Sequence, residues 1–446
     1  MKRVVIIGGV AAGMSAASQL RRMKEKEEVE ILVFEKGGDI SYSACGMPYY
    51  LSGVVKEKDD LVARTKQEFE ERNISVHLFH EVKEVNHTKK YIVVQNVKTQ
   101  TEKEVTYDEL IIATGTSAVK PNFMSDNMPN VCTLKSLEDS ERIYTYLQAH
   151  SVEKVTIIGG GYVGMEVAEA MKALGKEVRV IEQGKQILSI LDQEMAEHLQ
   201  KQLDDDILFH FEEEVEALLH SDGSVTHVQT NSQTYQTDLV IVNVGVRPNT
   251  QFLERNGLRM LENGAILVNE KLETNVPHIY AAGDCATSYH RVLKKDVHIA
   301  LGTIANKQGR VLGYRLGGEN REFPGVVGTS IVKVMDYEIG KTGISEREAR
   351  ENSLLYKAIT AEAPSHASYY PGAEKIVIKL VYHPETKEIL GVQMIGKEGV
   401  AKRIDVFATA ITCRLTTDEI TMLDLSYAPP FATVWDAVQI AAQKAE

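Results

Sequence analysis

The stretch Val155-Thr156-Ile157-Ile158-Gly159-Gly160-Gly161-Tyr162-Val163-Gly164 decides the fold class of this chain. An apolar run, typical of a buried strand, is followed at once by Gly159, Gly161 and Gly164, which fit the pattern GxGxxG and open a helix through about Leu174. The first glycine permits a tight turn, the second lets backbone amides approach a pyrophosphate, and the third lets the helix pack closely on the strand. The pattern predicts a dinucleotide site, whereas the alternative is an ordinary glycine-rich turn.

The next predicted strand, Val178 to Glu182, bears on the choice of nucleotide. Glu182 lies eighteen residues after Gly164, where a carboxylate accepts hydrogen bonds from ribose hydroxyls and repels a 2′-phosphate. This position favours NADH. Because Lys185 nearby weakens the preference, NADH and NADPH both stay open.

The same order of elements opens the chain, so the sequence contains an internal duplication. The strand Val4 to Ile7 is followed by Gly8-Gly9-Val10-Ala11-Ala12-Gly13, by an apolar-periodic helix through about Met23, and by the strand Ile31 to Glu35. Val10 stands where the second glycine is expected, and Glu35 again ends the second strand. Strands that alternate with helices in this way predict two doubly wound parallel sheets.

The rest of the chain continues both units and then changes character. A β-rich stretch runs from His77 to Val97. Further buried strands end at glycine turns within residues 107–115, 238–245 and 279–284. From about Phe323, valine- and isoleucine-rich strands precede helices around 404–412 and 434–444, which predicts a separate α+β domain.

Composition narrows the class of protein. The chain has 446 residues, 43% of them hydrophobic and 25% charged, as expected for a globular protein of about three domains. Its net charge of -13 argues against non-specific binding to nucleic acid or to an anionic membrane surface. Because the sequence opens on a strand, we expect no signal peptide, and no apolar run approaches the ~20 residues of a membrane span. Four scattered cysteines (Cys45, Cys132, Cys285 and Cys413) form neither a disulfide framework nor a zinc pattern, so we expect a reducing cytoplasm and no metal.

Cys45, in the run Ser41-Tyr42-Ser43-Ala44-Cys45-Gly46-Met47-Pro48-Tyr49, is the candidate reactive group. It lies between the two nucleotide units and has no cysteine nearby. Its oxidised form must therefore be a mixed disulfide with a small thiol, a persulfide or a sulfenic acid. Because the following residues are expected to open a helix, whose N-terminal amides favour an anion, we predict a lowered thiol pKa.

Several motifs together give the chain a family resemblance over nearly its whole length. They are the two glycine motifs, the run from Ser41 to Tyr49, Ala113-Thr114-Gly115, Tyr280-Ala281-Ala282-Gly283-Asp284, His366-Ala367-Ser368-Tyr369-Tyr370-Pro371-Gly372 and Ser426-Tyr427-Ala428-Pro429-Pro430-Phe431. With these, the chain resembles the pyridine nucleotide–disulfide oxidoreductase superfamily and, within it, the single-cysteine branch that contains the coenzyme A-disulfide reductases.

The resemblance implies a three-domain dimer that binds FAD and NADH or NADPH. Residues 1–118 and 246–322 would form the FAD-binding domain, 119–245 the NAD(P)H-binding domain and 323–446 the dimerisation domain. Asp284 would lie near the ribityl and phosphate groups of FAD, although a helix-capping aspartate is the alternative. Tyr162 and Glu166 are expected in the nicotinamide pocket, where Tyr162 could also simply pack. The full set of expected cofactor residues is Gly8, Val10, Ala11, Gly13, Glu35, Lys36, Ser43, Pro48, Val82, Ala113, Thr114, Gly115, Gly159, Gly161, Tyr162, Val163, Gly164, Glu166, Glu182, Gly245, Gly283, Asp284 and Ala300.

The resemblance also implies a coenzyme A site with a shared catalytic centre. Its substrate contacts fall on Ser15, Gln19, Arg22, Ser41, Ala44 and Asn306. The first three share one face of the first helix, and the planar fork of Arg22 suits a phosphate, although a solvated helix end is the alternative. Two lysines expected in the family appear here as Asn73 and Trp435, which weakens the assignment of intact coenzyme A disulfide.

The implied reaction is reduction of coenzyme A disulfide. Electrons would pass from NADH through the flavin to a mixed disulfide between Cys45 and coenzyme A, and the freed thiolate would then attack a new coenzyme A disulfide. Tyr369 and Tyr427 of the partner subunit would reach Cys45, and one or the other would donate a hydrogen bond to the leaving sulfur. Plain interface packing is the alternative role for these tyrosines.

Three other functions stay open. A water-forming NADH oxidase or a peroxidase would cycle Cys45 through sulfenic acid, but the histidine of those relatives is Ala11 here. A coenzyme A persulfide or polysulfide reductase is the second, and the absence of room for a C-terminal rhodanese domain argues against it. A redox-sensing flavoprotein without turnover is the third.

Overall fold

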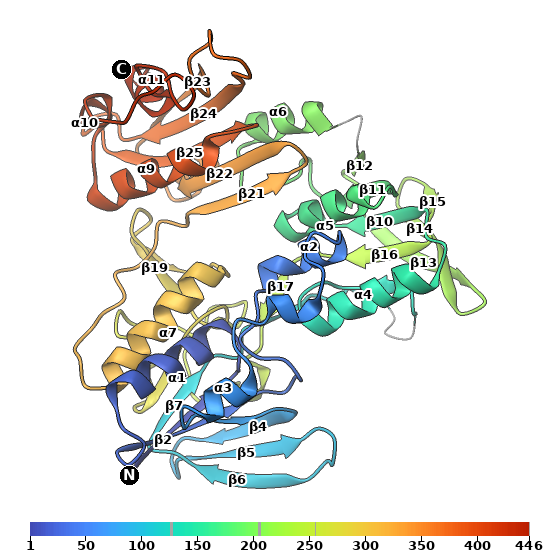
Figure 1. Ribbon diagram of the computed structural model, residues 1–446, viewed down its shortest axis with the longest axis vertical. Helices are drawn as coiled ribbons and strands as arrows, with labels where there is room; N and C mark the ends of the chain where they lie inside the picture. The colour runs from blue at the N-terminus through green and yellow to red at the C-terminus, as the bar shows by residue number, and fades with distance from the viewer. Residues whose placement is uncertain (125–127, 204–206, 255, 446) are drawn as a thin grey trace.

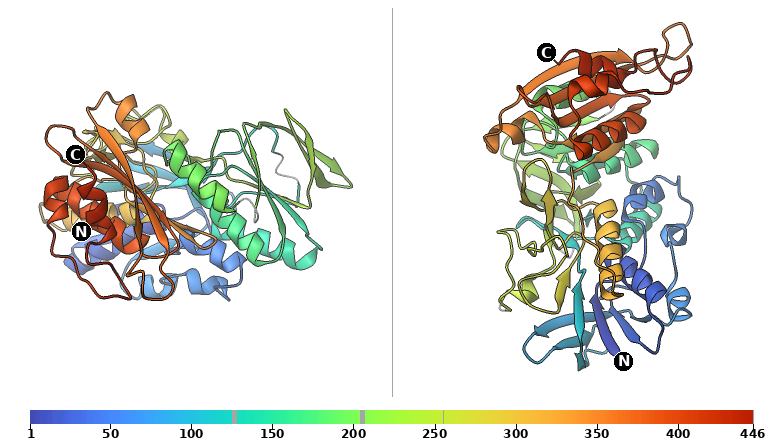
Figure 2. Two further views of the ribbon diagram at one scale, coloured as in Figure 1. Left: turned by 90° about the horizontal axis from the view of Figure 1, so that it is seen from above. Right: turned by 90° about the vertical axis from the view of Figure 1, so that its left-hand side faces the viewer.

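The computed structural model describes residues 1–124, 128–203, 207–254 and 256–445. The chain forms three lobes (Figure 1). The N-terminal lobe and the C-terminal lobe lie at opposite ends of the molecule, and the second lobe packs beside the C-terminal one (Figures 1 and 2). None of the helices in the described ranges combines the length and the apolar character needed to cross a membrane.

The first lobe is built on a five-stranded parallel sheet of order β18-β7-β1-β2-β3. A three-stranded antiparallel sheet, β4-β5-β6, extends it. The first segment comprises β1 (Lys2–Ile7), α1 (Ala11–Met23), β2 (Val29–Phe34), the 3-10 turn η1 (Ala44–Gly46), α2 (Met47–Leu51), η2 (Lys58–Leu61), α3 (Lys66–Glu70), β3 (Ser75–His77), β4 (His80–Asn86), β5 (Tyr91–Asn96), β6 (Glu102–Thr106), β7 (Glu109–Ile112) and β8 (Thr116–Ala118). The chain later returns to this lobe with β17 (Val246–Pro248), η3 (Gln251–Leu253), β18 (Ile279–Ala281), β19 (Ser288–His290), β20 (Lys295–Val297) and α7 (Gly302–Leu316).

The second lobe repeats this architecture, with the sheet order β12-β11-β10-β16-β9 and parallel pairing throughout. Its elements are β9 (Val131–Cys132), α4 (Leu137–Ala149), β10 (Lys154–Ile158), α5 (Tyr162–Ala173), β11 (Glu177–Glu182), α6 (Gln193–Leu203), β12 (Leu208–Phe211), β13 (Val215–Ser221), β14 (Ser224–Thr230), β15 (Thr234–Gln236) and β16 (Leu239–Val242). The central strands β1 and β10 occupy equivalent places, so the duplication expected from the sequence is confirmed in the strand order.

The third lobe is an antiparallel sheet of order β21-β22-β25-β24-β23. Its elements are β21 (Ser330–Val334), β22 (Tyr337–Gly343), α8 (Glu346–Glu351), β23 (Lys357–Pro364), β24 (Lys375–Tyr382), β25 (Ile389–Gly396), α9 (Val400–Cys413), α10 (Thr417–Thr421) and α11 (Ala437–Gln443). Alternate residues of β24 explain how the sheet is covered. Ile376 and Ile378 pack with α9 and α11, whereas Val377 belongs to the core shared with the second lobe.

The expected fold class, two doubly wound parallel sheets followed by an α+β domain, is confirmed. The exact domain limits stay a prediction. In their favour, β8 pairs with β17, so the two chain crossings between the first and second lobes lie side by side.

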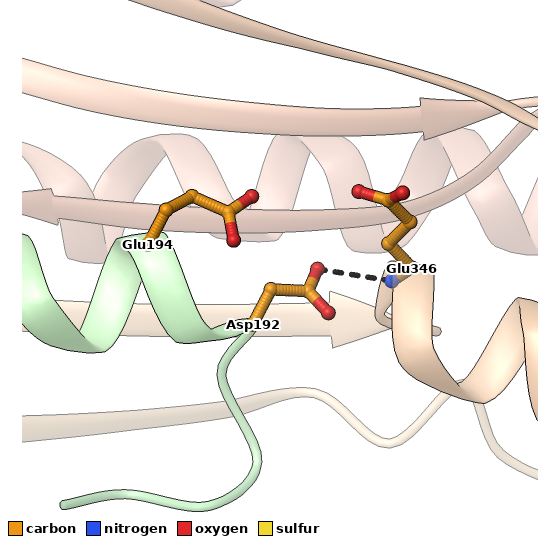
Figure 3. Close-up of side chains that lie close together, drawn as sticks. All are labelled: Asp192, Glu194 and Glu346. Atoms are coloured by element: carbon orange, nitrogen blue, oxygen red, sulfur yellow. Dashed lines mark hydrogen bonds between the residues drawn. The ribbon is translucent and has the colours of Figure 1, made fainter. Parts of the chain in front are cut away.

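A buried lysine joins the second and third lobes. The carboxylates of Asp192, Glu194 and Glu346 come together from the start of α6 and from α8 (Figure 3). Lys379 Nζ of β24 lies 3.0 Å from Asp192 and 2.8 Å from Glu346, and it also pairs with Glu194. Burial alone would lower the pKa of Lys379, but hydrogen bonds to these carboxylates outweigh it and raise that pKa. The cation among the three acids is therefore the protein's own lysine.

Candidate active site

The two glycine turns are held open by backbone contacts that exclude a side chain. A Cβ on Gly8 would lie 2.1 Å from the carbonyl oxygen of Ala113, and one on Gly159 would lie 2.4 Å from that of Asn243. Both glycines have a left-handed φ, of +108° and +104°. Gly13 and Gly164 close the turns in the same way, because a Cβ on either would lie 2.0 Å from the oxygen of the first glycine. Only glycine fits these positions.

Glu35 and Glu182 lie beside these turns in equivalent geometry. Glu35 accepts hydrogen bonds from the N–H groups of Gly9 and Gly37, both at 2.8 Å. Glu182 accepts from those of Gly160 and Gly184, both at 2.7 Å. Each carboxylate oxygen keeps a second lone pair, so both side chains can still accept from a ribose.

The helices that follow the two turns have bare N-termini. Helices α4, α8, α10 and α11 each begin with a capping box. Helix α1 begins after Val10 and α5 after Gly161, and like α7 and α9 they have neither a side-chain cap nor an acidic residue in the first turn. The buried amide nitrogen of Asn243, beside the second turn, also has no hydrogen-bond partner. Free N–H groups at these positions fit the phosphates of two dinucleotides.

The loop that carries Cys45 is tied to the first turn. The N–H of Ser41 donates to the carbonyl of Gly9 at 2.9 Å, and the Ser41 carbonyl accepts from Ala63 at 2.8 Å. Ser41 has a φ of 50°, a strained backbone conformation for a residue with a side chain. Cys45 follows in η1, at the entrance to α2. We call each glycine turn, with the helix start and the glutamate beside it, a cradle; the first contains Gly8, Gly13 and Glu35, and the second contains Gly159, Gly164 and Glu182. The structure therefore places the thiol loop beside the first cradle, and Ala44 and Ser43 flank the thiol.

The expected lowering of the Cys45 pKa is wrong for the polypeptide itself. Cys45 is solvent-accessible, but partial burial of its thiol raises the pKa, and the carboxylates of Glu166 and Asp284 raise it further. Lys135 acts in the opposite direction. The expectation rested on the amides of α2, a helix of only five residues, and on a bound flavin. The acids that the fold brings near Cys45 cannot be recognised from the sequence.

Lys135 is a site residue that the sequence reasoning missed. Its Nζ donates to Asp284 Oδ2 at 3.2 Å. Lys135 belongs to no recognisable motif and directly precedes Ser136, the N-cap of α4. It lies near Asp284 and Cys45 only because the first two lobes pack against each other. A cation here favours the thiolate, as does a backbone hydrogen bond at Cys45.

Glu166 and Tyr162 both belong to the first turns of α5. Glu166 acts electrostatically on Cys45, whereas Tyr162 reaches the third lobe. Partial burial, with a contribution from Glu169, raises the pKa of Glu166 to about 7. The hydroxyl of Tyr162 shares a hydrogen bond with Ser330 of β21. Tyr162 thus has a definite packing partner in the third lobe, whereas Val163 is exposed.

The expected substrate contacts of α1 and α7 come together in two pairs. Ser15 Oγ donates to Asn306 Oδ1 at 2.7 Å, and Arg22 Nη1 donates to Gln19 Oε1 at 3.0 Å. Gln19 is buried, while Arg22 and Asn306 are exposed. Asn73 is exposed near the end of α1, where its carbonyl accepts from Arg21.

Tyr369 and Tyr427 lie together on the third lobe. Their hydroxyls are 3.2 Å apart, and this hydrogen bond raises the pKa of Tyr369. Both rings are exposed, and so is Trp435 in the same region. The segment between β23 and β24 that carries Tyr369 projects from the outer end of this lobe, away from α2 (Figures 1 and 2). Within one chain the structure does not bring these tyrosines to Cys45.

The other expected cofactor residues surround the two cradles. Ala113, Thr114 and Gly115 follow β7, Gly245 follows β16, and Gly283 and Asp284 follow β18. Ala11 and Val10 lie at the start of α1, Pro48 is buried in α2, and Ala300 precedes α7. Lys36 is exposed after β2, and Val82 is buried in β4. Their binding roles stay predictions.

Comparison with known proteins identifies the family. The sequence model of pyridine nucleotide-disulphide oxidoreductases matches residues 2–309, and that of their dimerisation domain matches residues 329–438. The chain belongs to the pyridine nucleotide-disulphide oxidoreductase family.

Individual relatives place the chain within that family. It is 38% identical to an NAD(P)H coenzyme A polysulfide/persulfide reductase of Pyrococcus horikoshii, over 99% of this chain and 98% of the relative. It is 34% identical to a coenzyme A disulfide reductase of Staphylococcus aureus, over the full length of both. The crystal structure of reduced CoADR-RHD from Bacillus anthracis superimposes with a TM-score of 0.95 at 35% identity, covering 100% of this chain and 80% of that one. The resemblance to the coenzyme A-disulfide reductase branch is confirmed.

Proposed function

We propose that this protein is an NAD(P)H-dependent flavoenzyme that reduces coenzyme A disulfide to two coenzyme A thiols through a mixed disulfide on Cys45. The observation that carries the proposal is the position of Cys45. It is a free, accessible thiol whose loop is hydrogen-bonded to the first glycine turn and whose electrostatic neighbours come from both nucleotide units. All four cysteines of the chain are free, and two of them, Cys132 and Cys285, are fully buried.

The two cradles would hold the two nucleotides. FAD would lie against the first turn, with its pyrophosphate at α1 and its ribose at Glu35. NAD(P)H would lie against the second turn, at α5 and Glu182. When bound, FAD supplies two-electron transfer between the nicotinamide and a disulfide sulfur. The ammonium of Lys185 lies 3.8 Å from Glu212, so its charge is partly balanced and Glu182 favours NADH.

The thiol chemistry then balances as follows. The Cys45 thiolate attacks one sulfur of coenzyme A disulfide, forms the Cys45–coenzyme A bond and releases one coenzyme A thiolate. Two electrons from NAD(P)H cleave that mixed disulfide, which releases the second coenzyme A and restores the Cys45 thiolate. The hydroxyl of Tyr369 or Tyr427 would supply the proton that the departing sulfur takes up. The hydrogen bond between the two hydroxyls raises the pKa of Tyr369, so that phenol stays protonated near neutral pH.

A homodimer would complete this site. The match of residues 329–438 to a dimerisation domain supports the assembly, and the outward position of the tyrosines fits a contact with a second copy. Free cysteines spread over the lobes fit a reducing compartment, and we propose the cytoplasm.

The test is the intact mass of the purified protein after the flavin is released. We expect one coenzyme A adduct, removed by dithiothreitol and absent from Cys45→Ser. Cys413→Ser is the matched control, because Cys413 is the other exposed thiol and should leave the adduct in place. An unmodified or sulfinylated Cys45 in active wild-type protein would contradict the mixed disulfide.

Reduction of coenzyme A persulfide is the second candidate, favoured by the 38% identical polysulfide/persulfide reductase of Pyrococcus horikoshii. The two substrates differ in the group that accepts the electrons but share the coenzyme A thiol. Comparison of kcat/KM for coenzyme A disulfide and coenzyme A persulfide, with the same preparation, decides between them. A ratio above one for the persulfide would replace the disulfide as the substrate. The oxidase alternative predicts instead that oxygen is consumed without any coenzyme A compound.

A further inference from the structure

One buried arginine underlies the exposed tyrosines. Arg403 of α9 is 1% exposed and is the largest of the fully buried side chains in the described ranges. A buried guanidinium is costly unless nearly all its N–H groups are paired. The buried N–H groups of Arg403 therefore need several hydrogen-bond acceptors close by.

The four partners of Arg403 come from three segments of the chain. Its Nε donates to the carboxylate of Asp436 at 2.9 and 3.1 Å, and its Nη2 lies 2.9 Å from the same carboxylate. Nη1 donates to the carbonyl of Gly399 at 3.0 Å. Nη2 also donates to the carbonyls of Ser365 at 2.8 Å and Phe431 at 3.3 Å.

The last two carbonyls belong to the loops that carry the tyrosines. Ser365 lies four residues before Tyr369, and Phe431 lies four residues after Tyr427. Both loops lack regular secondary structure at these tyrosines. They meet once more through the backbone, where Ala367 N–H donates to the carbonyl of Pro429 at 3.2 Å.

We propose that Arg403 is a positioning residue for the tyrosine pair. Its Nη2 holds the carbonyls of Ser365 and Phe431 at a fixed spacing while Nε pairs with Asp436, and this spacing keeps the two phenols within hydrogen-bond distance of each other. The inference rests on the proposed function, because the pair matters only if it delivers a proton to the departing coenzyme A sulfur. A lysine could not reproduce the arrangement, because one ammonium cannot reach an aspartate and two separate carbonyls with the same geometry.

The first experiment uses the flavin-loaded dimer of Arg403→Lys. Trp435 is the single tryptophan of the chain and adjoins Asp436, so its fluorescence reports on this loop directly. We expect stronger iodide quenching of Trp435 with an unchanged far-ultraviolet circular dichroism spectrum. We expect kcat with coenzyme A disulfide to fall roughly tenfold, with the KM for NADH unchanged, because a small displacement of a catalytic group costs rate rather than nucleotide binding.

A double-mutant cycle separates positioning from general loss of stability. In a Tyr369→Phe/Tyr427→Phe background, Arg403→Lys should cause no further loss of kcat, because it acts through the tyrosines. The same tenfold loss in both backgrounds would overturn the proposal, and so would unchanged quenching and unchanged kcat in the single variant. Lys341→Met is the matched control. Lys341 is buried and pairs with Glu348 at 2.8 Å, so its removal should lower stability without changing the quenching or kcat.

Two further arms keep the result decisive. If Arg403→Lys does not fold, Asp436→Asn keeps the carbonyl partners and weakens the ion pair, and the same two readouts apply to it. If wild-type protein shows no turnover with coenzyme A disulfide, the proposed function fails, but the quenching comparison still reports whether Arg403 fixes the loops.

Discussion

Helices α1 and α5 have equivalent N-termini but different packing partners. Each follows a central parallel strand and a glycine turn, each lacks a side-chain cap, and each lies beside a carboxylate that binds backbone amides. The two cradles are therefore set by the backbone. The outward faces of the two helices differ in what they contact.

Helix α1 is packed against its own lobe. A Cβ on Gly309 of α7 would lie 2.1 Å from the carbonyl of Ala12, so the two helices touch at the backbone. Their polar edge carries Ser15 and Asn306, the expected substrate contacts. Helix α5 faces the third lobe instead, where Glu169 pairs with Lys333 of β21 and accepts from the N–H of Met335 at 3.0 Å. Helix α1 is thus closely packed within its own lobe, whereas α5 makes charged contacts with the third lobe.

The largest expected effect tests the charged contacts between the second and third lobes. The variant removes Lys379, the lysine that pairs with carboxylates of both lobes. In Lys379→Met three carboxylates would remain together with no cation among them. We expect the free energy of unfolding to fall by about 4 kcal/mol, the usual cost of breaking a buried ion pair. Chemical denaturation followed by circular dichroism measures it. Lys375→Met is the control on the same strand, because Lys375 and its partner Glu362 are exposed, and it should leave the unfolding midpoint unchanged.

The fold was open to prediction from the sequence because its determinants are local. Gly8, Gly159, Glu35 and Glu182 follow fixed spacings from a strand, so the pattern alone predicts the turn and the acid beside it.

The missed residues are of another kind. Lys135, Lys379 and Arg403 are single charged residues without a motif, and each gains its role from segments distant in the sequence. The wrong expectation for the Cys45 pKa has the same origin, since the nearby carboxylate of Glu166 lies on a different lobe. Local pattern predicts the cradles, whereas the electrostatics of the site follow from the assembly of the lobes.

The close packing of α1 against α7 in the first lobe can be tested at Gly309. An added methyl group in Gly309→Ala would meet the backbone of Ala12, so the two helices would have to separate. We expect a loss of about 2 to 3 kcal/mol in the free energy of unfolding, together with weaker FAD retention. Gly302→Ala on the same helix is the control, because no atom lies within 4 Å of its added Cβ. If both variants lost the same free energy of unfolding, the loss at Gly309 would not come from its contact with Ala12. The close packing of α1 that distinguishes it from α5 would then be refuted.

The coupling of the second unit to the thiol can be tested at Glu166. With a pKa of about 7, this carboxyl is neutral in weak acid and charged above neutral pH. The charged form raises the Cys45 pKa, so Glu166→Gln should lower it. The lower Cys45 pKa should increase the rate of Cys45 alkylation at pH 8 roughly threefold, with little change at pH 6, where Glu166 is neutral in the wild type. Iodoacetamide labelling of the reduced protein, followed by mass, gives the rates. Exposed Glu177→Gln should behave as wild type, and a slower rate in Glu166→Gln would refute the coupling.

The smallest expected effect concerns the exposed end of α1. Arg22 is held by Gln19, which leaves most of its guanidinium free for an anionic ligand. Arg22→Ala should raise the KM for coenzyme A disulfide about twofold, the usual size for a contact by an exposed charge, and leave kcat unchanged, because Arg22 would bind the substrate without touching the reacting sulfur. Steady-state kinetics at two salt concentrations measure this. The gap between wild type and variant should narrow as salt rises, since an exposed charge is screened.

The duplication supplies the matched control for this last variant. Lys172 is the basic residue in the last turn of α5, as Arg22 is in the last turn of α1. If substrate lies along α1 alone, Lys172→Ala should change neither KM nor kcat. An equal rise of KM in both variants would show that Arg22 acts only through the general charge of the protein. In that case the outward faces of the two helices would not be specialised, and the substrate would have to be sought elsewhere on the first lobe.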